Sequence, residues 1–349
     1  MKHVLVDMHR LKYNPYNGLY RFSQELGSAM SCLHDSELKL HFYLPATSFG
    51  IFGNNASYVT HRSIDKFYSF GTHKFDIWHA TTTLSWYRPF NKKTKFVFTI
   101  HDLNFLAEYE RSTLHKQRYF RLIQERVNRA DFITYISEFS RQQAMAYLNI
   151  DHKPSKVIYN GCNKPEAEHF RTPAYVPTKP FLFSIGLFMS RKNFHVLPAL
   201  LVGTDYELVL AGLNHFEYKQ RVLDAAKEAG VLDRVKLVGP ISDEEKFWYY
   251  QHCDAFLFPS IGEGFGLPII EAMWFGKPVF LSTETCLPEI GGDVAYYFKS
   301  FDADAMRQAF AEGMQHYLQT TPMQKIKEHA AQFSWSKAAH EYMEVYKSL

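Results

Sequence analysis

Short, uninterrupted hydrophobic runs recur along the first part of the chain, separated by longer stretches in which polar and apolar residues mix. Because these runs do not alternate with polar residues, they are typical of strands in a parallel sheet that helices cover on both faces. The clearest helical patterns between them are residues 19–33 and 110–130. We therefore predict a repeated β–α domain. Its predicted strands are residues 3–8, 38–44, 77–80, 96–100 and 132–136.

A second series of the same kind follows a proline-rich stretch at residues 163–180. That stretch holds few residues suited to a helix or strand, which predicts a linker. Helices are expected between the later hydrophobic runs, notably at 216–229, 243–253 and 268–275. The five later runs are residues 181–186, 206–211, 235–238, 255–259 and 278–282.

The two series together predict an α/β protein with two tandem doubly wound domains. We expect an N-terminal domain at 1–165, a linker at 166–179, a C-terminal domain at 180–333 and a terminal segment at 334–349. Doubly wound sheets bind ligands outside the carboxyl ends of their strands. Two Rossmann-like domains that face one another are therefore expected to form a cleft.

The composition indicates an uneven distribution of charge along the chain and the cellular compartment of the protein. The net charge is only +3, yet residues 1–179 contain 24 Lys or Arg against 15 Asp or Glu, and residues 180–349 contain 15 against 21. A basic first half suggests an anionic partner, although uneven halves also occur without one. The four cysteines form no C-x-x-C pair, which favours a reducing compartment. The N-terminal apolar run is too short for a signal peptide and no stretch could span a bilayer, so we expect a cytoplasmic protein.

The segment from Phe256 to Gly276 contains the clearest chemical pattern in the chain. A predicted strand ends near Pro259, a glycine-rich loop follows, and Pro268 suits the first turn of a helix. Glycines allow the backbone to approach a ligand and present N–H groups beside a helix N-terminus. Two carboxylates, Glu263 in the loop and Glu271 one turn into the helix, could accept hydrogen bonds from vicinal hydroxyls. An ordinary strand–turn–helix, with Glu271 complementing the helix dipole, would show the same pattern.

This segment resembles the E-x7-E signature of the retaining glycosyltransferases of family 4, which adopt the GT-B fold. The resemblance implies that Glu263 contacts the donor sugar and that Glu271 holds the ribose hydroxyls of a nucleotide-sugar. Basic residues at the matching strand end clamp the donor diphosphate in that family, which assigns this role to Arg191 and Lys192. Fixed cations there would stabilise a departing diphosphate. The loop residues that complete the match are Gly264, Phe265, Gly266 and Leu267.

Weaker matches follow in the order of the family. Gly18 lies in a segment similar to the loop that approaches the donor phosphates, although the family often has two glycines there. His101, in a His-Asp-Leu segment, is assigned to the active-site wall, whereas a lone histidine at a strand end is more often structural. Val238 and Gly239 correspond to the strand end that contacts the base, and Glu289 is a further, weaker candidate. The resemblance also implies that the terminal helix packs back on the N-terminal domain.

The expected function is metal-independent, retaining transfer of a hexose in surface polysaccharide synthesis, including O antigen, with no cofactor. GDP-mannose is the favoured donor, and the acceptor is a saccharide or a lipid-linked saccharide that the N-terminal domain would bind. Basic and apolar residues mix in the predicted helix at 110–129, which suggests a peripheral contact with the inner face of the cell membrane, or simply a packed helix with solvated arginines. No motif indicates nucleic acid. The pattern Asp302-Ala-Asp304 is predicted to cap a helix rather than to bind a metal.

Two alternatives from other classes remain open. The chain could be a catalytically silent GT-B nucleotide-binding partner of an active transferase, or a nucleotide-sugar epimerase of the same fold. Intact Arg191, Lys192, Glu263 and Glu271 favour an active enzyme over a silent one.

Overall fold

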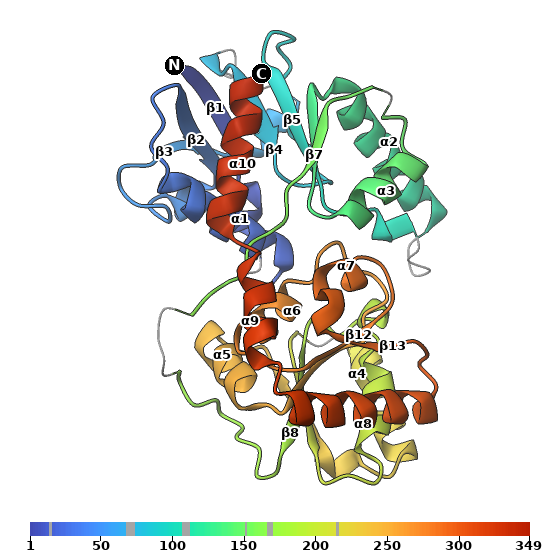
Figure 1. Cartoon of the computed structure of the whole chain (residues 1–349). Coiled ribbons are helices and arrows are strands. Elements are labelled where there is room, and N and C mark those ends of the chain that lie inside the picture. The colour runs from blue at the N-terminus through green and yellow to red at the C-terminus, as the bar shows by residue number, and fades with distance from the viewer. Residues whose placement is uncertain (14–15, 68–73, 107–111, 151, 166–169, 214–215) are drawn as a thin grey trace. The chain divides into compact units, whose positions relative to one another are not determined.

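The structure is a computed structural model, and it describes all residues except 14–15, 68–73, 107–111, 151, 166–169 and 214–215. The chain divides into two compact units (Figure 1). Unit 1 contains Met1–Gly161 together with Ser334–Leu349, and unit 2 contains Cys162–Phe333. Residues 170–179 of the expected linker form neither helix nor strand, and residues 166–169 of it lie outside the described residues.

The described residues of unit 1 form a seven-stranded parallel sheet in the order β3-β2-β1-β4-β5-β6-β7. Because β1 pairs with both β2 and β4, the strand order reverses at β1, and right-handed connections then place helices on both faces. The strands are β1 (Lys2–Asp7), β2 (Leu38–Leu44), β3 (Ser57–Thr60), β4 (Ile77–Ala80), β5 (Lys95–Ile100), β6 (Phe132–Tyr135) and β7 (Ser155–Val157).

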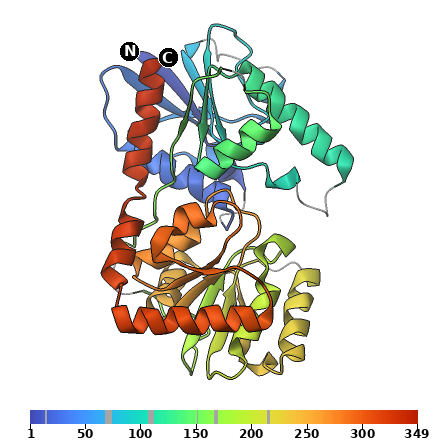
Figure 2. The ribbon, with the colours of Figure 1, turned by 45° about the vertical axis from the view of Figure 1, so that its right-hand side comes forward.

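The helices of unit 1 form two groups. Helix α10 packs beside α1 although the two lie at opposite ends of the sequence, and the rings of Phe22 and Trp335 meet edge to face at 5.7 Å. Helices α2 and α3 lie apart from that pair (Figures 1 and 2). Residues 110–111 of the predicted basic helix lie outside the described residues, and α2 begins at Thr113. The helices are α1 (Gly18–Ser31), α2 (Thr113–Arg129), α3 (Glu138–Tyr147) and α10 (Trp335–Ser348), with short turns η1 (His9–Lys12), η2 (Ala46–Ser48), η3 (Ser63–Lys66) and η5 (Asn104–Leu106).

The described residues of unit 2 form a six-stranded parallel sheet in the order β10-β9-β8-β11-β12-β13. Its order reverses at β8, which pairs with both β9 and β11. Ligands of doubly wound sheets bind at such a switch point, outside the carboxyl ends of the strands. The strands are β8 (Phe181–Ile185), β9 (Glu207–Ala211), β10 (Val235–Gly239), β11 (Ala255–Phe258), β12 (Val279–Ser282) and β13 (Tyr296–Phe298).

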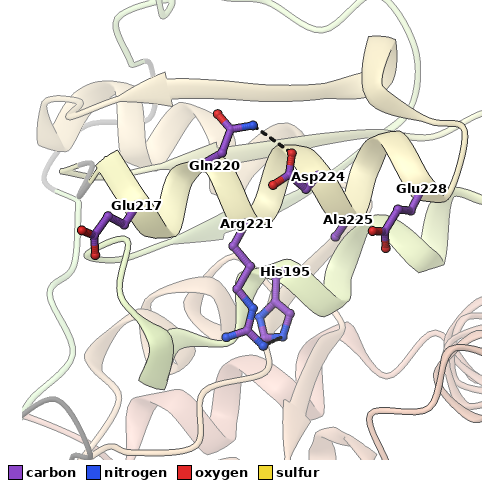
Figure 3. Close-up of a pocket in the computed structure, with 7 residues that line it drawn as sticks. All are labelled: His195, Glu217, Gln220, Arg221, Asp224, Ala225 and Glu228. Atoms are coloured by element: carbon purple, nitrogen blue, oxygen red, sulfur yellow. Dashed lines mark hydrogen bonds between the residues drawn. The ribbon is translucent and has the colours of Figure 1, made fainter.

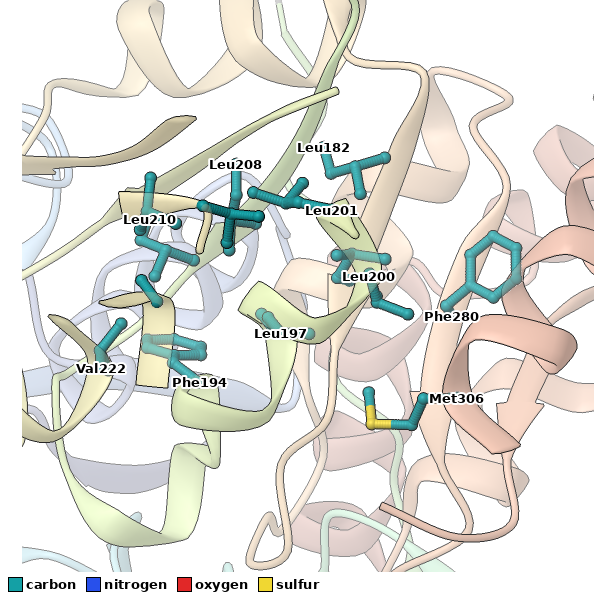
Figure 4. Close-up of a cluster of buried hydrophobic side chains, with 14 of the residues drawn as sticks. Leu182, Phe194, Leu197, Leu200, Leu201, Leu208, Leu210, Val222, Phe280 and Met306 are labelled. Carbon is teal, nitrogen blue, oxygen red and sulfur yellow. The ribbon is translucent and has the colours of Figure 1, made fainter. Parts of the chain in front are cut away.

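A hydrophobic cluster lies between one face of this sheet and the elements that cover it (Figure 4). Leucines of β8 and β9 meet leucines of η7, and side chains from α4, β12 and α8 complete the cluster. The helices of unit 2 are α4 (Phe216–Glu228), α5 (Asp243–His252), α6 (Leu267–Trp274), α7 (Leu287–Gly291), α8 (Ala303–Thr320) and α9 (Met323–Ala331), with short turns η6 (Ser190–Lys192), η7 (Phe194–Leu201), η8 (Leu232–Arg234) and η9 (Gly292–Val294).

The predicted α/β class with two doubly wound domains is confirmed, and every predicted strand coincides with an observed one. Three short strands, β3, β7 and β13, were not predicted. All three are edge strands, and most of their residues are half-buried or exposed rather than buried as in the interior strands. The segment after β8 forms the 3-10 turn η7, which has Pro198 inside it.

Candidate active site

The glycine loop connects β11 to α6 through a residue with left-handed backbone geometry. Gly266, at the N-cap of α6, has φ of +92°, and a Cβ there would lie 2.7 Å from Ile269 Cδ1. Glycine is therefore strongly favoured at this position. Pro268 lies in the first turn, as predicted, and Gly264 and Phe265 are buried while Leu267 is half-buried. The Phe265 ring meets Phe333 edge to face at 5.7 Å. This turn carries Glu263 and Glu271 to the carboxyl end of β11.

The loop after β8 is fastened to the glycine loop by backbone and side-chain hydrogen bonds. Arg191 O accepts from Ile261 N at 2.8 Å, and Ser260 Oγ lies 2.9 Å from the same oxygen. In return, Arg191 Nη1 donates to Gly262 O at 3.0 Å. Asn193 follows in the left-handed conformation, with φ of +57°, and reverses the chain after Lys192. The neighbouring strands β8 and β11 thus place the basic pair and the first signature carboxylate together.

Lys192 and Glu263 form a buried ion pair, with Nζ 2.5 Å from Oε1. Their exposed fractions are 8% and 9%, and Ser260 Oγ donates to the same Oε1 at 2.6 Å. Burial alone would raise the pKa of Glu263, but the charges of Lys192 and Arg191 and the hydrogen bonds to Oε1 hold it below its ordinary value. Glu263 is thus an ionised carboxylate. Its Oε2 accepts no hydrogen bond from the residues that the structure describes.

Glu271 is 3% exposed and is surrounded by three hydrogen-bond donors, two from α5 and one from the start of unit 2. Lys246 Nζ lies 3.0 Å from Oε1, and Asn163 Nδ2 donates to the same oxygen at 2.9 Å. Tyr250 OH donates to Oε2 at 3.1 Å. Burial and then the Glu271 charge raise the pKa of Tyr250 well above its ordinary value, so the phenol keeps its proton. Sequence reasoning missed these three residues, and no motif marks them.

His101 lies in unit 1, just beyond the end of β5, and is buried. Its Nε2 is 2.7 Å from Thr81 O, and because a carbonyl only accepts, Nε2 carries the proton. Burial lowers the pKa of His101 to about 4, so the ring is neutral near pH 7 and its Nδ1 is an acceptor. Two side-chain hydroxyls bond to the backbone of His101. The N–H of His101 donates to Thr83 Oγ1, and Ser140 Oγ donates to His101 O.

The remaining predicted residues occupy less constrained places. Gly18 is the first residue of α1, where Asn17 Oδ1 caps the helix by accepting from Leu19 N, and a Cβ on Gly18 would meet nothing within 4 Å. Val238 and Gly239 are half-buried at the end of β10, the edge strand that β9 separates from β8. Glu289 lies in the first turn of α7.

Two other features fall outside the predicted donor site. Asp302 caps α8 as predicted, since its Oδ1 accepts from Asp304 N and Ala305 N. In the described part of the chain, no three His, Cys, Asp or Glu side chains are grouped so that they could hold a metal ion. A polar cavity of about 380 Å³ runs along α4 (Figure 3). It is lined by His195, Glu217, Gln220, Arg221, Asp224, Ala225 and Glu228, none of which was predicted to bind the donor.

Comparison with known proteins places this arrangement in a family. The model "Glycosyltransferase Family 4" matches residues 41–164, and the model "Glycosyl transferases group 1" matches residues 166–332. The two matches are consecutive and cover most of both units. The chain therefore belongs to the family 4 glycosyltransferases, as predicted.

Curated relatives include two bacterial mannosyltransferases. The serotype-specific mannosyltransferase WbdA of Escherichia coli is 30% identical over 273 residues, which are 70% of this chain and 32% of WbdA. The chain thus spans about a third of that relative. O-antigen chain mannosyltransferase B of Escherichia coli is 26% identical over 292 residues, 76% of this chain and 73% of that protein.

Solved structures share the fold over the whole chain. Sucrose-phosphate synthase from Thermosynechococcus elongatus superposes with a TM-score of 0.77 at 18% identity, covering 100% of this chain and 99% of that one. Anabaena HepE in complex with UDP-glucose superposes with a TM-score of 0.70 at 16% identity, covering 100% of both chains. The fold is that of the GT-B glycosyltransferases. None of the described helices combines the length and apolar character needed to cross a bilayer.

Proposed function

We propose that this chain transfers mannose from GDP-mannose to a saccharide acceptor, with retention of the anomeric configuration and without a metal. The observation that carries the proposal is the buried Lys192–Glu263 pair beside Arg191 at the switch point of unit 2. Mannose is favoured because WbdA and O-antigen chain mannosyltransferase B are both named mannosyltransferases. UDP-glucose is the second donor to test, because HepE was solved in complex with it.

The leaving group in this reaction is a nucleoside diphosphate. Negative charge grows on its bridging oxygen as the bond to the sugar C1 breaks, and fixed cations stabilise that charge. Arg191 is half-buried and uses Nη1 for Gly262, and Lys192 has three N–H donors, one of which is directed at Glu263. Both cations can therefore meet the diphosphate, which is why no metal is invoked.

Glu263 is assigned to recognition of the transferred sugar rather than to attack on it. Its Oε1 is engaged by Lys192 and Ser260, and Oε2 remains as the acceptor for a sugar hydroxyl. Because these contacts fix its orientation and neutralise its charge, the carboxylate is a well-directed hydrogen-bond acceptor and a poor nucleophile. The acceptor oxygen then bonds to C1 on the face that the diphosphate leaves. The acceptor proton passes to the departing diphosphate oxygen.

His101 and Gly18 are assigned to the same reaction from unit 1. The neutral imidazole of His101 offers Nδ1 to a sugar hydroxyl, while the Nε2 proton is held by Thr81 O. Gly18 offers a backbone N–H at the start of α1 to the donor phosphates. The same reasoning assigns the base to the end of β10, at Val238 and Gly239.

A lipid-linked acceptor and a peripheral membrane contact are proposed on a surface of unit 1. Trp86 and Leu114 are exposed to 38% and 76%. The Arg118 guanidinium lies 5.1 Å from the Trp86 ring, and that of Arg88 lies 4.7 Å from the Phe90 ring. Exposed aromatic rings beside cations favour an anionic bilayer surface. We expect sedimentation with vesicles that contain phosphatidylglycerol but not with phosphatidylcholine alone, and loss of sedimentation in a Trp86→Ser/Leu114→Ser variant. Equal sedimentation of this variant would remove the membrane proposal.

The decisive experiment measures binding and transfer separately. Calorimetry with GDP, UDP and ADP identifies the base, and a transfer assay with GDP-mannose or UDP-glucose and a mannose-terminated acceptor measures the reaction. We expect an α-linked product from an α-linked donor by NMR and an unchanged rate after dialysis against EDTA. Nucleotide binding without transfer to any acceptor would support the silent partner. A changed free donor without an acceptor would support the epimerase.

A further inference from the structure

The second signature carboxylate has nearly all its acceptor positions occupied before any ligand binds. An ionised carboxylate accepts at about four lone-pair sites, two on each oxygen. Oε1 of Glu271 accepts hydrogen bonds from Lys246 Nζ at 3.0 Å and from Asn163 Nδ2 at 2.9 Å. Oε2 accepts a hydrogen bond from Tyr250 OH at 3.1 Å. Among the described residues, no donor occupies the fourth acceptor position of the Glu271 carboxylate, which is on Oε2.

Two of the three donors belong to α5, and the third lies in the segment that precedes β8. Lys246 belongs to α5 and is 8% exposed, and its Nζ also lies 3.3 Å from Asp243 Oδ1. Tyr250, one turn further along α5, is fully buried. Asn163 lies close to the start of unit 2, where Cys162 Sγ donates to Ile270 O in α6 at 3.3 Å. The carboxylate is therefore fixed in direction by groups from α5 and from the segment that precedes β8.

We infer that Lys246 is a positioning residue that, with Asn163 and Tyr250, directs the one open position of Glu271 at a single ribose hydroxyl of the nucleotide. The inference rests on the proposed function, because it needs Glu271 to face the ribose. It deepens that function in two respects. It names a cation that acts through Glu271 rather than on the ligand, and it restricts the carboxylate to one of the two vicinal hydroxyls.

The test compares ribonucleotides with deoxynucleotides, because the two differ only in the hydroxyl concerned. Calorimetry with GDP, UDP and ADP first selects the base that binds most tightly, and the 2′-deoxy and 3′-deoxy forms of that nucleoside diphosphate follow. A hydrogen bond to a charged group is worth enough to give a loss of roughly 10- to 100-fold. We expect that loss for one of the two deoxy forms and a change of less than about 3-fold for the other. Equal losses for both deoxy forms would overturn the single-hydroxyl assignment.

The Lys246→Met variant then separates positioning from general structure. We expect it to bind the ribonucleotide about 10-fold more weakly, and to bind the sensitive deoxy form as tightly as the natural protein does. Equal weakening of the ribo and deoxy forms would show that Lys246 only supports the fold. Lys227→Met is the matched control, because Lys227 is exposed on α4 and should change neither affinity.

A double variant keeps the inference testable if Lys246→Met folds poorly. In Lys246→Met/Glu271→Gln both members of the buried pair lose their charge, and the affinity should match that of Glu271→Gln alone within about 2-fold. A further loss beyond Glu271→Gln would mean that Lys246 acts on the nucleotide directly and would overturn the inference. If the natural protein binds none of the three nucleoside diphosphates, the proposed function itself fails, and this outcome is distinct from the others.

Discussion

Lys192 Nζ and Glu263 Oε1 lie 2.5 Å apart, although 71 positions of sequence separate the two residues. The contact joins the loop after β8 to the loop after β11, which are neighbouring strands at the switch point of unit 2. The contact gives Lys192 a second role in addition to the proposed binding of the diphosphate. The ammonium also keeps Glu263 ionised and fixed, so a change at either residue is expected to affect both folding and transfer.

Glu263→Gln should reduce transfer by at least about 100-fold, because the acceptor for the sugar hydroxyl is replaced by a neutral amide. The same change leaves the buried Lys192 without its counter-charge, which typically costs about 3–5 kcal/mol of unfolding free energy. Urea unfolding and initial transfer rates measure the two effects. The double variant Lys192→Met/Glu263→Gln should regain most of the stability and none of the transfer. If the double variant is less stable than Glu263→Gln alone, the pair is not the source of the loss.

Arg191→Met should lower the transfer rate by about 10²–10³-fold, since a preorganised donor to the developing charge is removed. Arg191 is only half-buried and its lost hydrogen bond to Gly262 O is worth about 1 kcal/mol, so the melting temperature should fall by a few degrees at most. Arg307→Met, at a half-buried position of α8, is the matched control and should leave the rate unchanged. A normal rate in Arg191→Met would remove this arginine from the diphosphate site.

Stability should fall as the pH drops from about 6.5 towards 4. Burial lowers the pKa of His101 to about 4 and that of His79 to about 3, whereas both titrate near 6.5 in the unfolded chain. Between these values the unfolded chain binds more protons than the folded chain, so unfolding becomes easier as protons are added. Each histidine should account for about 2 kcal/mol between pH 7 and pH 5.

Urea unfolding at the two pH values measures this slope. His79 is held by Tyr346 OH at Nδ1 and Thr99 Oγ1 at Nε2. Because burial also lowers the pKa of His41 and of His195 to about 4, His79→Gln should remove only its own share, so the stability lost between pH 7 and pH 5 should be about 2 kcal/mol smaller than in the natural protein. A natural protein equally stable at pH 7 and pH 5 would contradict the assignment of two buried neutral rings.

Gly266→Ala and Gly262→Ala should differ although both lie in the same loop. Gly266 has φ of +92°, and a Cβ there would meet Ile269 Cδ1 at 2.7 Å, so alanine should cost about 1–2 kcal/mol and displace α6 with Glu271. At Gly262 an added Cβ would make ordinary contacts with Arg191 at 3.5 Å. We expect Gly262→Ala to keep the melting temperature of the natural protein. Similar melting temperatures for the two variants would contradict the backbone argument.

Local signals in the sequence were sufficient for much of this protein. Continuous hydrophobic runs marked the interior strands because a strand covered on both faces must be apolar at every position. Pro268 marked the start of α6, and Asp302 marked the cap of α8, because both effects depend on a few adjacent residues. The spacing of Glu263 and Glu271, together with Arg191-Lys192, indicated the family and the fold.

How those side chains are used depends on contacts between distant parts of the chain. Lys246 follows three acidic residues at the start of α5, where a lysine would be expected in solvent, yet it is buried against Glu271, 25 positions away. Asn163 reaches the same carboxylate from 108 positions away, and no local pattern records such a contact. The low pKa of His101 likewise depends on burial by distant elements. The local sequence is enough to specify which charged groups are present and which strands and helices carry them. The packing of two parallel sheets determined which of those groups meet, because burial and pairing depend on distances across the fold.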